Sequence, residues 1–175
     1  MTKNEPNIIL GGCMKQLRLR AVIQLIIWLF LFALPIHAQL AVKKVLTLDA
    51  AKKLALAAET EALKNKWTMV IAIADDGGNL MYLEKIDNTQ IGSIEVAIKK
   101  AKTAILFKRP TKVFEDKVLK EGRTVILSLP NAIAIEGGLP IIVDGQYIGA
   151  IGVSGGSSDQ DGVVAKAAVD QFSNQ

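Results

Sequence analysis

The sequence predicts an α+β fold, in which helices pack on a mainly antiparallel sheet. Short runs rich in β-branched residues are joined by turn sequences typical of hairpins, at residues 75–79 and 144–145. Segments with apolar residues at helical spacing stand before, between and after these hairpins. The 175 residues contain no internal repeat or low-complexity linker, and this length fits one folded domain.

Residues 14–38 have the pattern of a secretory signal peptide. Basic side chains within residues 15–20 precede an almost unbroken apolar run over residues 21–34, and Pro35 and Ala38 follow. The run is shorter than the roughly 20 apolar residues that a membrane-spanning helix needs. We therefore expect cleavage after Ala38 and a periplasmic or secreted protein with no membrane attachment after cleavage. An uncleaved N-terminal anchor is the alternative.

Removal of this segment would leave a chain without thiol or imidazole groups. Residues 1–13 precede a second methionine and are interpreted as an upstream extension, so that residues 39–175 form the single folded domain. Cys13 and His37 are the only cysteine and histidine, and both lie before residue 39. Disulfides, thiol or imidazole catalysis, Cys/His zinc sites and imidazole ligation of haem would then be excluded, and no metal site is predicted.

The charge of residues 39–175 does not indicate a nucleic-acid partner. This part of the chain holds 17 basic and 16 acidic side chains, a net charge of +1. The basic balance of the whole sequence therefore comes mainly from the N-terminal segment.

One helix is predicted before the first hairpin and one after it. Thr47 is the expected N-cap of the first, and Ser93 is the expected N-cap of the second, which ends before Pro110. The apolar stripe of the first helix is mostly alanine, which lets a helix lie close against a sheet. Its members recur every three or four residues: Leu48, Ala51, Ala55, Ala58 and Ala62.

Two further helices are predicted in the second half of the chain. Thr111 is expected to cap a short helix. The last helix begins near Asp159, where a capping box is expected from one of two pairs, Ser158 with Asp161 or Ser157 with Gln160.

Four runs predict strands, at residues 69–74, 80–86, 139–143 and 147–153. The apolar run at residues 132–135 also stands in the last third of the chain, where we expect about three strands. Residues 125–129 fit either a strand or a loop packed on the core, and we interpret them as irregular.

Two glycine-rich turns and one basic stretch are the candidate binding features. The turn at residues 154–158 precedes a helix N-terminus, which favours binding of a phosphate or carboxylate. The alternative is that its glycines serve only the backbone conformation and the close packing of strand and helix. The turn at residues 136–140 either places the Glu136 carboxylate at a pocket mouth or is a strand entry with Glu136 in solvent. Basic residues recur over 99–112, and they form either a solvated helix face or a patch for propionates or phosphates.

Several segments together resemble the GlcG/HbpS-like haem-binding (haem-degrading) family. The resemblance rests on EGGLPI at residues 136–141, on DGQYIGAIGVSGG at residues 144–156, and on QD with VAKAA at residues 160–168. AKTA at residues 101–104 and DDGGNL at residues 75–80 are similar to the same family.

The resemblance implies a profilin-like fold, with a central antiparallel sheet of about five strands flanked by helices. It also implies homo-oligomers and, for some members, haem binding. Histidine ligation of haem, as found in some members, does not apply to a processed chain that has no histidine. Haem would then be held by apolar contacts and by Lys or Arg at its propionates, with a tyrosine or no axial ligand. The soft or phenolic candidates are Tyr82, Tyr147, Met69 and Met81.

Our first interpretation is an exported, non-catalytic protein that binds haem or a small anionic metabolite and forms homo-oligomers. The second is an enzyme on a small carboxylate metabolite, with Glu136 or Asp161 as acid/base and Lys102 or Arg123 holding the carboxylate. The third is a purely structural oligomeric module. The expected ligand-binding residues are Glu136, Gly137, Gly138, Pro140, Ser154, Gly155, Gly156, Lys102 and Arg109.

Overall fold

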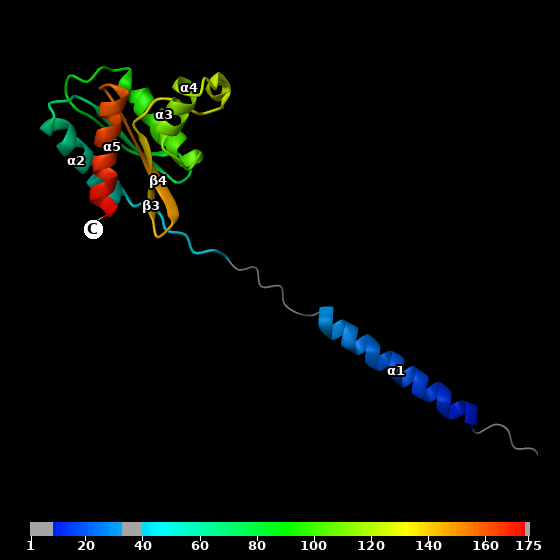
Figure 1. Ribbon diagram of the computed structural model, residues 1–175. Coiled ribbons are helices and arrows are strands. Elements are labelled where there is room, and N and C mark those ends of the chain that lie inside the picture. The colour runs from blue at the N-terminus through cyan, green and yellow to red at the C-terminus, as the bar shows by residue number, and fades with distance from the viewer. Residues whose placement is uncertain (1–8, 33–39, 174–175) are drawn as a thin grey trace, which may run out of the picture. The chain divides into compact units, whose positions relative to one another are not determined.

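The computed structural model describes residues 9–32 and 40–173, which fall into two units dividing after Ala41. The first unit contains a single described helix, α1 (Ile9–Phe32), which begins upstream of Met14 and covers most of the predicted signal peptide (Figure 1). Among the described helices, none is long and apolar enough to cross a membrane. The predicted cleavage after Ala38, and His37, lie outside the described residues.

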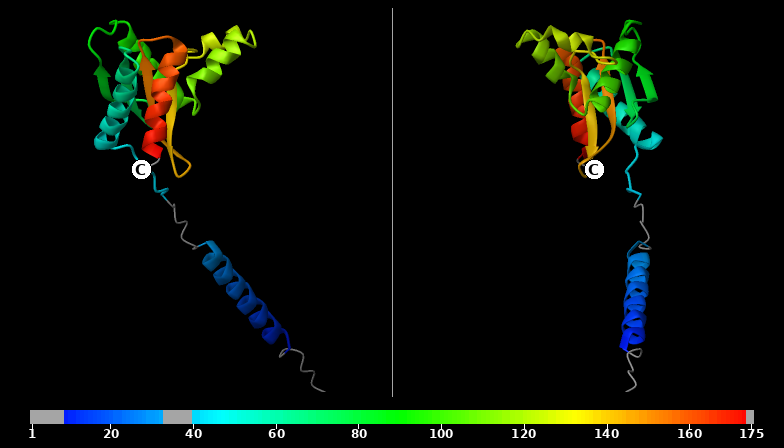
Figure 2. Two further views of the ribbon diagram at one scale, coloured as in Figure 1. Left: turned by 60° about the vertical axis from the view of Figure 1, so that its left-hand side comes forward. Right: turned by 90° about the vertical axis from the view of Figure 1, so that its right-hand side faces the viewer.

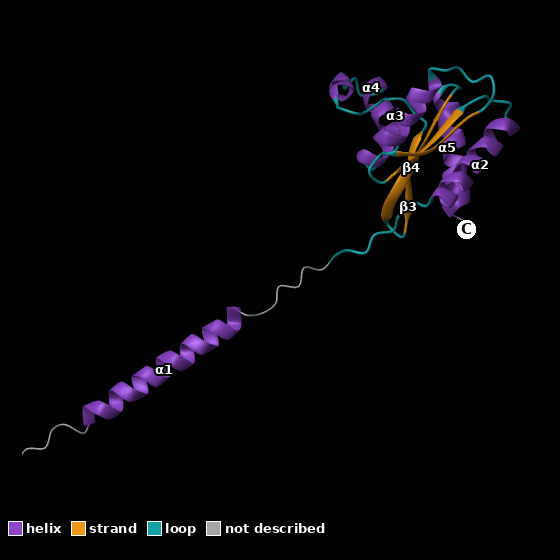
Figure 3. Ribbon diagram, turned by 180° about the vertical axis from the view of Figure 1, so that it is seen from behind, coloured by secondary structure: helices purple, strands orange, loops and turns teal. Residues whose placement is uncertain are grey.

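The second unit is an antiparallel sheet with helices on both faces, as the α+β prediction requires (Figures 1 and 3). The strand order is β2-β1-β4-β3, and every pairing is antiparallel. The described chain therefore has four strands in this sheet, where both the sequence pattern and the resemblance implied about five; residues 132–135 are not a strand. The elements are α2 (Leu48–Lys64), β1 (Val70–Asp75), β2 (Leu80–Lys85), α3 (Ser93–Leu106), α4 (Thr111–Leu119), the short 3-10 helix η1 (Thr124–Ser128), β3 (Gly138–Val143), β4 (Gln146–Ser154) and α5 (Ser158–Ser173).

Apolar residues of β1 and β4 divide between the two faces of the sheet. Ile71, Ile73 and Val153 join the larger core cluster beneath α2 and α5. Val70 and Ala72 pack with residues of α3 on the opposite face. Both faces are covered, which explains why β1 is a continuous apolar run rather than an alternating one.

The helix caps agree with the sequence at two positions. The Thr47 side chain accepts a hydrogen bond from Ala50 N–H, and the α2 alanine stripe is buried, although Leu48 is half-exposed. At α5 the capping box is the pair Ser157 and Gln160: Gln160 Oε1 accepts from Ser157 N–H at 3.0 Å, and Ser157 Oγ accepts from Gln160 N–H at 3.4 Å.

The predicted caps at Ser93 and Thr111 are wrong. Ser93 is the first residue of α3, which has no side-chain cap, and its hydroxyl instead accepts from the Gln90 amide. Thr111 is buried at the start of α4, and its Oγ1 accepts a hydrogen bond from Gly138 N–H at 2.9 Å. Both hydroxyls therefore bond outside their own helix termini, and a sequence pattern does not reveal such partners.

Residues 111–131 form an extension from the sheet, which we call the arm. It consists of α4, η1 and the connection that follows them, and Figure 2 shows α4 directed away from the sheet. Leu119, Val125 and Leu127 are each more than 60% exposed on it. Residues 124–128 form a short 3-10 helix with no buried residue, so this region is neither a strand nor a loop packed on the core.

Close contact between α3 and β4 depends on Gly152. A Cβ atom added at Gly152 would lie 2.1 Å from Ala97 O and 2.5 Å from Ala101 N, which are backbone atoms of α3. Ala97 and Ala101 are fully buried, so the small side chains on both elements allow the helix backbone to approach the strand.

We expect Gly152→Ala to destabilise the fold by about 2 kcal/mol or more, because the added methyl group forces α3 away from the sheet. The free energy of unfolding from urea titration measures this. Gly92→Ala is the matched control, because its Cβ would meet no atom within 4 Å, and it should change stability by less than about 0.5 kcal/mol. An unchanged Gly152→Ala variant would contradict the proposed contact.

Candidate functional site

A buried ion pair between Lys100 and Asp161 lies where α3, β4 and α5 meet. Lys100 Nζ donates to Asp161 Oδ2 at 2.6 Å and to the carbonyl oxygen of Val153 at 3.0 Å. The two side chains are 1% and 3% exposed. Asp161 Oδ1 in turn accepts from Gly156 N–H at 3.0 Å. The pair thus forms hydrogen bonds that join α3, β4 and the turn before α5 in the interior.

Burial raises the pKa of the Asp161 carboxyl, against the hydrogen bond and charge of Lys100 and the N–H groups of Gly156 and Gly155, which stabilise the ionised form. Both oxygens of Asp161 are engaged, one by the Lys100 ammonium and one by the turn at the start of α5. The carboxyl therefore fixes the glycine turn to α3.

The glycines of the 136–140 turn bring the chain against this pair. Gly137 has φ +118°, and a Cβ there would lie 2.7 Å from Val153 O and 2.9 Å from Lys100 Nζ. A Cβ at Gly138 would lie 2.5 Å from the Lys100 carbonyl oxygen. The space beside both glycines is therefore filled by the protein's own atoms.

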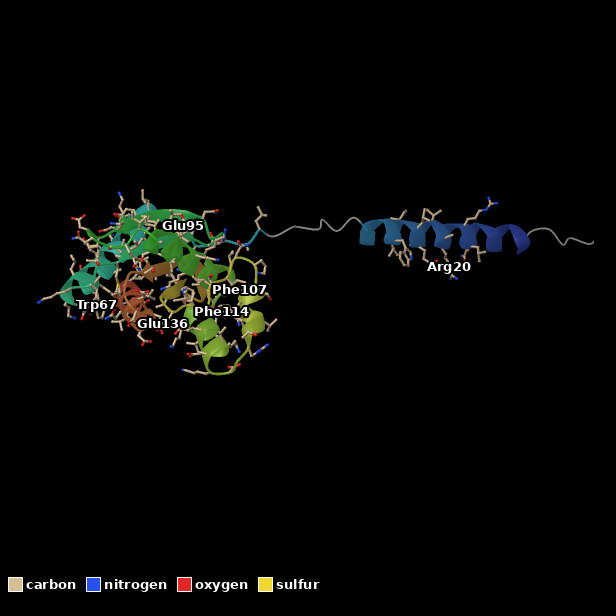
Figure 4. All side chains as sticks on the ribbon, turned by 90° about the horizontal axis from the view of Figure 1, so that it is seen from above. Arg20, Trp67, Glu95, Phe107, Phe114 and Glu136 are labelled. Carbon is tan, nitrogen blue, oxygen red and sulfur yellow. The ribbon has the colours of Figure 1, made fainter. Side chains whose placement is uncertain are left out.

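The Glu136 side chain is held in a second polar cluster at the base of α4. Glu136 Oε2 lies 3.0 Å from Lys112 Nζ, and Glu136 N–H donates to Glu115 Oε2 at 2.5 Å. The hydrogen bond to Glu136 is the main cause of a raised pKa at Lys112. Ser158 Oγ donates to the other Glu115 oxygen at 3.4 Å. The cluster joins the arm, the turn and α5, and Figure 4 labels Glu136 and Phe114 in this region.

The structure brings some of the predicted binding residues together and separates others. Glu136, Gly137, Gly138, Gly155 and Gly156 gather around Asp161 and the base of α4.

The remaining four lie elsewhere. Pro140 and Ser154 pair with Ala150 and Val70 within the sheet. Arg109 donates from Nε to Phe107 O at 3.0 Å and lies 5.8 Å from the Phe114 ring centroid. Lys102 lines a pocket on α3.

That pocket, which we call the α3 pocket, has a volume of about 430 Å³. Its lining combines an apolar side chain with cationic, acidic and amide groups: Glu95, Ile98, Lys99, Lys102 and Asn131. Buried Thr103 fixes one wall, because its Oγ1 lies 3.3 Å from Asn131 O and accepts from Ile133 N–H at 3.0 Å. Asn131 has φ +58°, an uncommon backbone conformation for a residue with a side chain.

A second pocket of about 340 Å³ adjoins the end of α3 and the two hairpin turns. We call it the hairpin pocket. It is lined by Lys43, Asp76, Ile105, Lys108, Gly145, Gln146 and Tyr147. Lys102 of the α3 pocket and Ile105 of the hairpin pocket are three residues apart in α3, so the two pockets follow one another along this helix.

Sequence reasoning missed the role of Lys100, which it grouped with the basic stretch. Lys100 is fully buried, whereas Lys99, Lys108 and Arg109 are exposed. Its position was a usable signal: Lys100 follows Ala97 by three residues and precedes Ala104 by four, which places it within the apolar face of α3. Asp161 had been considered only as a cap or a catalytic acid. Across residues 9–32 and 40–173, no cluster of acidic, histidine or cysteine side chains has a metal-binding arrangement.

The model of the HbpS-like family, which is described as "Haem degrading protein HbpS-like", matches residues 46–170. The chain belongs to this family. The GlcG protein of Escherichia coli strain K12 is 43% identical over 112 residues, which are 64% of this chain and 83% of that protein.

Two solved structures have the same fold. The Klebsiella pneumoniae protein ORFY is 31% identical with a TM-score of 0.72, and the match covers 81% of this chain and 99% of that one. A PduOC complex with haem is 29% identical with a TM-score of 0.66, covering 73% and 94% of the two chains. The resemblance identified from the 136–156 motifs is therefore confirmed.

We expect Asp161→Ala to destabilise the protein by about 3–5 kcal/mol, because it leaves the Lys100 ammonium buried without its counter-ion. Adding Lys100→Met should recover part of this loss. Asp170→Ala in the same helix is the control: its ion pair with Lys166 is exposed and should contribute less than about 1 kcal/mol. Thermal and urea unfolding of the four proteins measure the difference. Equal effects for Asp161→Ala and Asp170→Ala would contradict the structural role of the pair.

Proposed function

We propose that this protein is an exported, non-catalytic binding protein whose ligand is haem or a small organic anion. The observation that carries the proposal is the pair Lys99 and Lys102 in the α3 pocket. The two lysines are three residues apart on α3, so they point to neighbouring positions on the helix surface. Within the described chain neither lysine forms an ion pair.

Family membership supports haem as one ligand. The matching family is described as haem degrading, and one structural neighbour was solved as a complex with haem. Haem carries two propionates, and lysine ammonium groups are suitable partners for them. The Asn131 amide and the apolar Ile98 complete a lining of the mixed type that small-molecule sites have.

The enzyme alternative has weaker support from the site. Asp161 is a buried carboxyl with a raised pKa, but it is ion-paired with Lys100 and lines neither the α3 pocket nor the hairpin pocket. Glu136 is paired with Lys112. Arg123, the other expected carboxylate partner, precedes η1 on the arm.

Export is proposed from the signal-peptide pattern of residues 14–38. Expression of the full chain in a Gram-negative host, followed by intact mass measurement of the periplasmic fraction, tests it. We expect a mass that corresponds to a chain beginning at Gln39. Recovery of the complete chain with the membrane fraction would favour an uncleaved anchor.

We expect the double variant Lys99→Ala with Lys102→Ala to bind haem and small carboxylates at least about tenfold more weakly than the unaltered protein, because charge-assisted contacts contribute roughly 1.5–3 kcal/mol each. Titration calorimetry with a carboxylate panel, and absorbance titration with haem, measure the affinity. Lys52→Ala with Lys53→Ala on α2 removes the same charge from exposed positions and is the matched control. Equal affinity of the two double variants would exclude the α3 pocket.

We also propose that copies of the chain associate, as the family resemblance implies. Leu119, Val125 and Leu127 on the arm are the exposed apolar side chains that a second copy would cover. Native mass spectrometry should give a multiple of the subunit mass. Leu127→Asp should shift the distribution toward the monomer, whereas Leu56→Asp on α2, which is similarly exposed, should not. A monomer at all concentrations would overturn the proposal.

A further inference from the structure

The α3 pocket contains an acidic side chain beside its two lysines. Glu95, Lys99 and Lys102 all line it, and they follow one another along α3 at positions i, i+4 and i+7. Such positions lie on one face of a helix, and the two lysines stand about 6 Å and about 10 Å along the axis from Glu95. Figure 4 labels Glu95 on this helix. The pocket therefore has a carboxylate toward the N-terminus of α3 and two ammonium groups toward its C-terminus.

These three charged groups have no ionic partner within the described chain. A glutamate and a lysine four residues further along a helix commonly form an ion pair. On α5 such a pair is present between Lys166 and Asp170. Glu95 and Lys99 form no such pair across the described residues, and Lys102 has no acidic partner there either. The charges of the α3 pocket are therefore available to a ligand.

The side chain of Lys102 is held in place along its aliphatic stem. A Cβ atom built at Gly78 would lie 3.3 Å from Lys102 Cγ, so the stem packs against the turn between β1 and β2. Lys102 is accordingly only partly exposed, whereas Glu95 and Lys99 are exposed. Packing of the stem limits the rotamers of the ammonium group, so less conformational entropy is lost when this group binds an anion.

The uncharged groups of the pocket suit a short carbon chain. Ile98 stands between Glu95 and Lys102 along the helix, and it packs against a buried cluster formed by β1 and α3. It therefore provides a fixed apolar surface between the charged groups. The side-chain amide of Asn131 offers both a hydrogen-bond donor and an acceptor. The Asn131 carbonyl oxygen accepts from Thr103 Oγ1 at 3.3 Å, which holds this residue beside α3.

We infer that the ligand of the α3 pocket is a small amino dicarboxylate, which carries two carboxylates and one ammonium group on a short carbon chain. The inference rests on the proposed binding of an organic anion at this pocket, and it names the class of anion. Such a ligand matches two lysines and one glutamate in number and in sign. Its carboxylates would bind Lys99 and Lys102, and its ammonium group would bind Glu95. A dicarboxylate without the amino group, or haem with its propionates, would leave Glu95 without a partner.

Three compounds that differ by one charged group test this inference. Titration calorimetry compares aspartate with succinate, which lacks the amino group, and with β-alanine, which lacks one carboxylate. Glutamate, glutarate and 4-aminobutyrate give the same comparison for a chain that is one carbon longer. In at least one of the two sets, we expect the amino dicarboxylate to bind about fivefold or more tightly than both of its analogues, because each analogue lacks one charge-assisted contact.

The variant Glu95→Gln tests the contact of the ammonium group. It should bind the amino dicarboxylate about fivefold or more weakly than the unaltered protein, whereas its affinity for the dicarboxylate should stay equal or rise, because a like charge has been removed. Glu121→Gln on the arm is the matched control. It also removes an exposed carboxylate, and both affinities should stay unchanged.

The outcomes separate this inference from the proposed function. Lysine-dependent binding of succinate, glutarate or haem, without a preference for the amino dicarboxylates, would overturn the inference and leave the proposed function standing. Unchanged affinity of Glu95→Gln for the amino dicarboxylate would also overturn the inference. If neither haem nor any of the six compounds bound, both proposals would be overturned.

Discussion

The buried ion pair of Lys100 with Asp161 is the interaction on which the arrangement of the second unit depends. A buried ammonium group and carboxylate lose their hydrogen bonds to water and need partners within the protein. Here the Val153 carbonyl accepts from Lys100, and the Gly156 amide donates to Asp161. These groups come from α3, β4 and the turn before α5, so the pair holds these three elements together. Gly137 is required beside the pair because a larger side chain would collide with it.

The sequence predicted most of the fold because its signals are local. Alanine spacing, the Asp144-Gly145 turn and the Thr47 cap act within a few residues, and all correspond to structure. Two of the failures come from partners distant in sequence: Thr111 binds Gly138, 27 residues away, and Lys100 pairs with Asp161. Ser93 was also expected to cap its own helix, but its hydroxyl accepts from the neighbouring Gln90 amide. Lys100 was grouped with solvated lysines, although its spacing from Ala97 placed it on the buried face.

The binding features were less predictable than the fold. The glycine-rich turns suggested a ligand site, but the space beside the glycines around Asp161 is occupied by the chain's own backbone and side chains. The two pockets on α3 are assembled from segments that no motif connects, such as Asn131 with Lys99, or Lys108 with Tyr147. Only Lys102 of the predicted binding residues lines either pocket. The face on which Tyr147 lies also depends on a bulge, which the alternating pattern of β4 does not reveal.

The attachment of the arm has a consequence for the dynamics of the molecule. Polar contacts of Lys112, Glu115 and Glu136 hold the base of the arm, whereas η1 beyond it buries no side chain. Backbone amides in η1 should therefore exchange with deuterium through local opening, while those of β4 exchange only when the sheet itself opens. The molecule therefore contains two regions of unequal cooperativity.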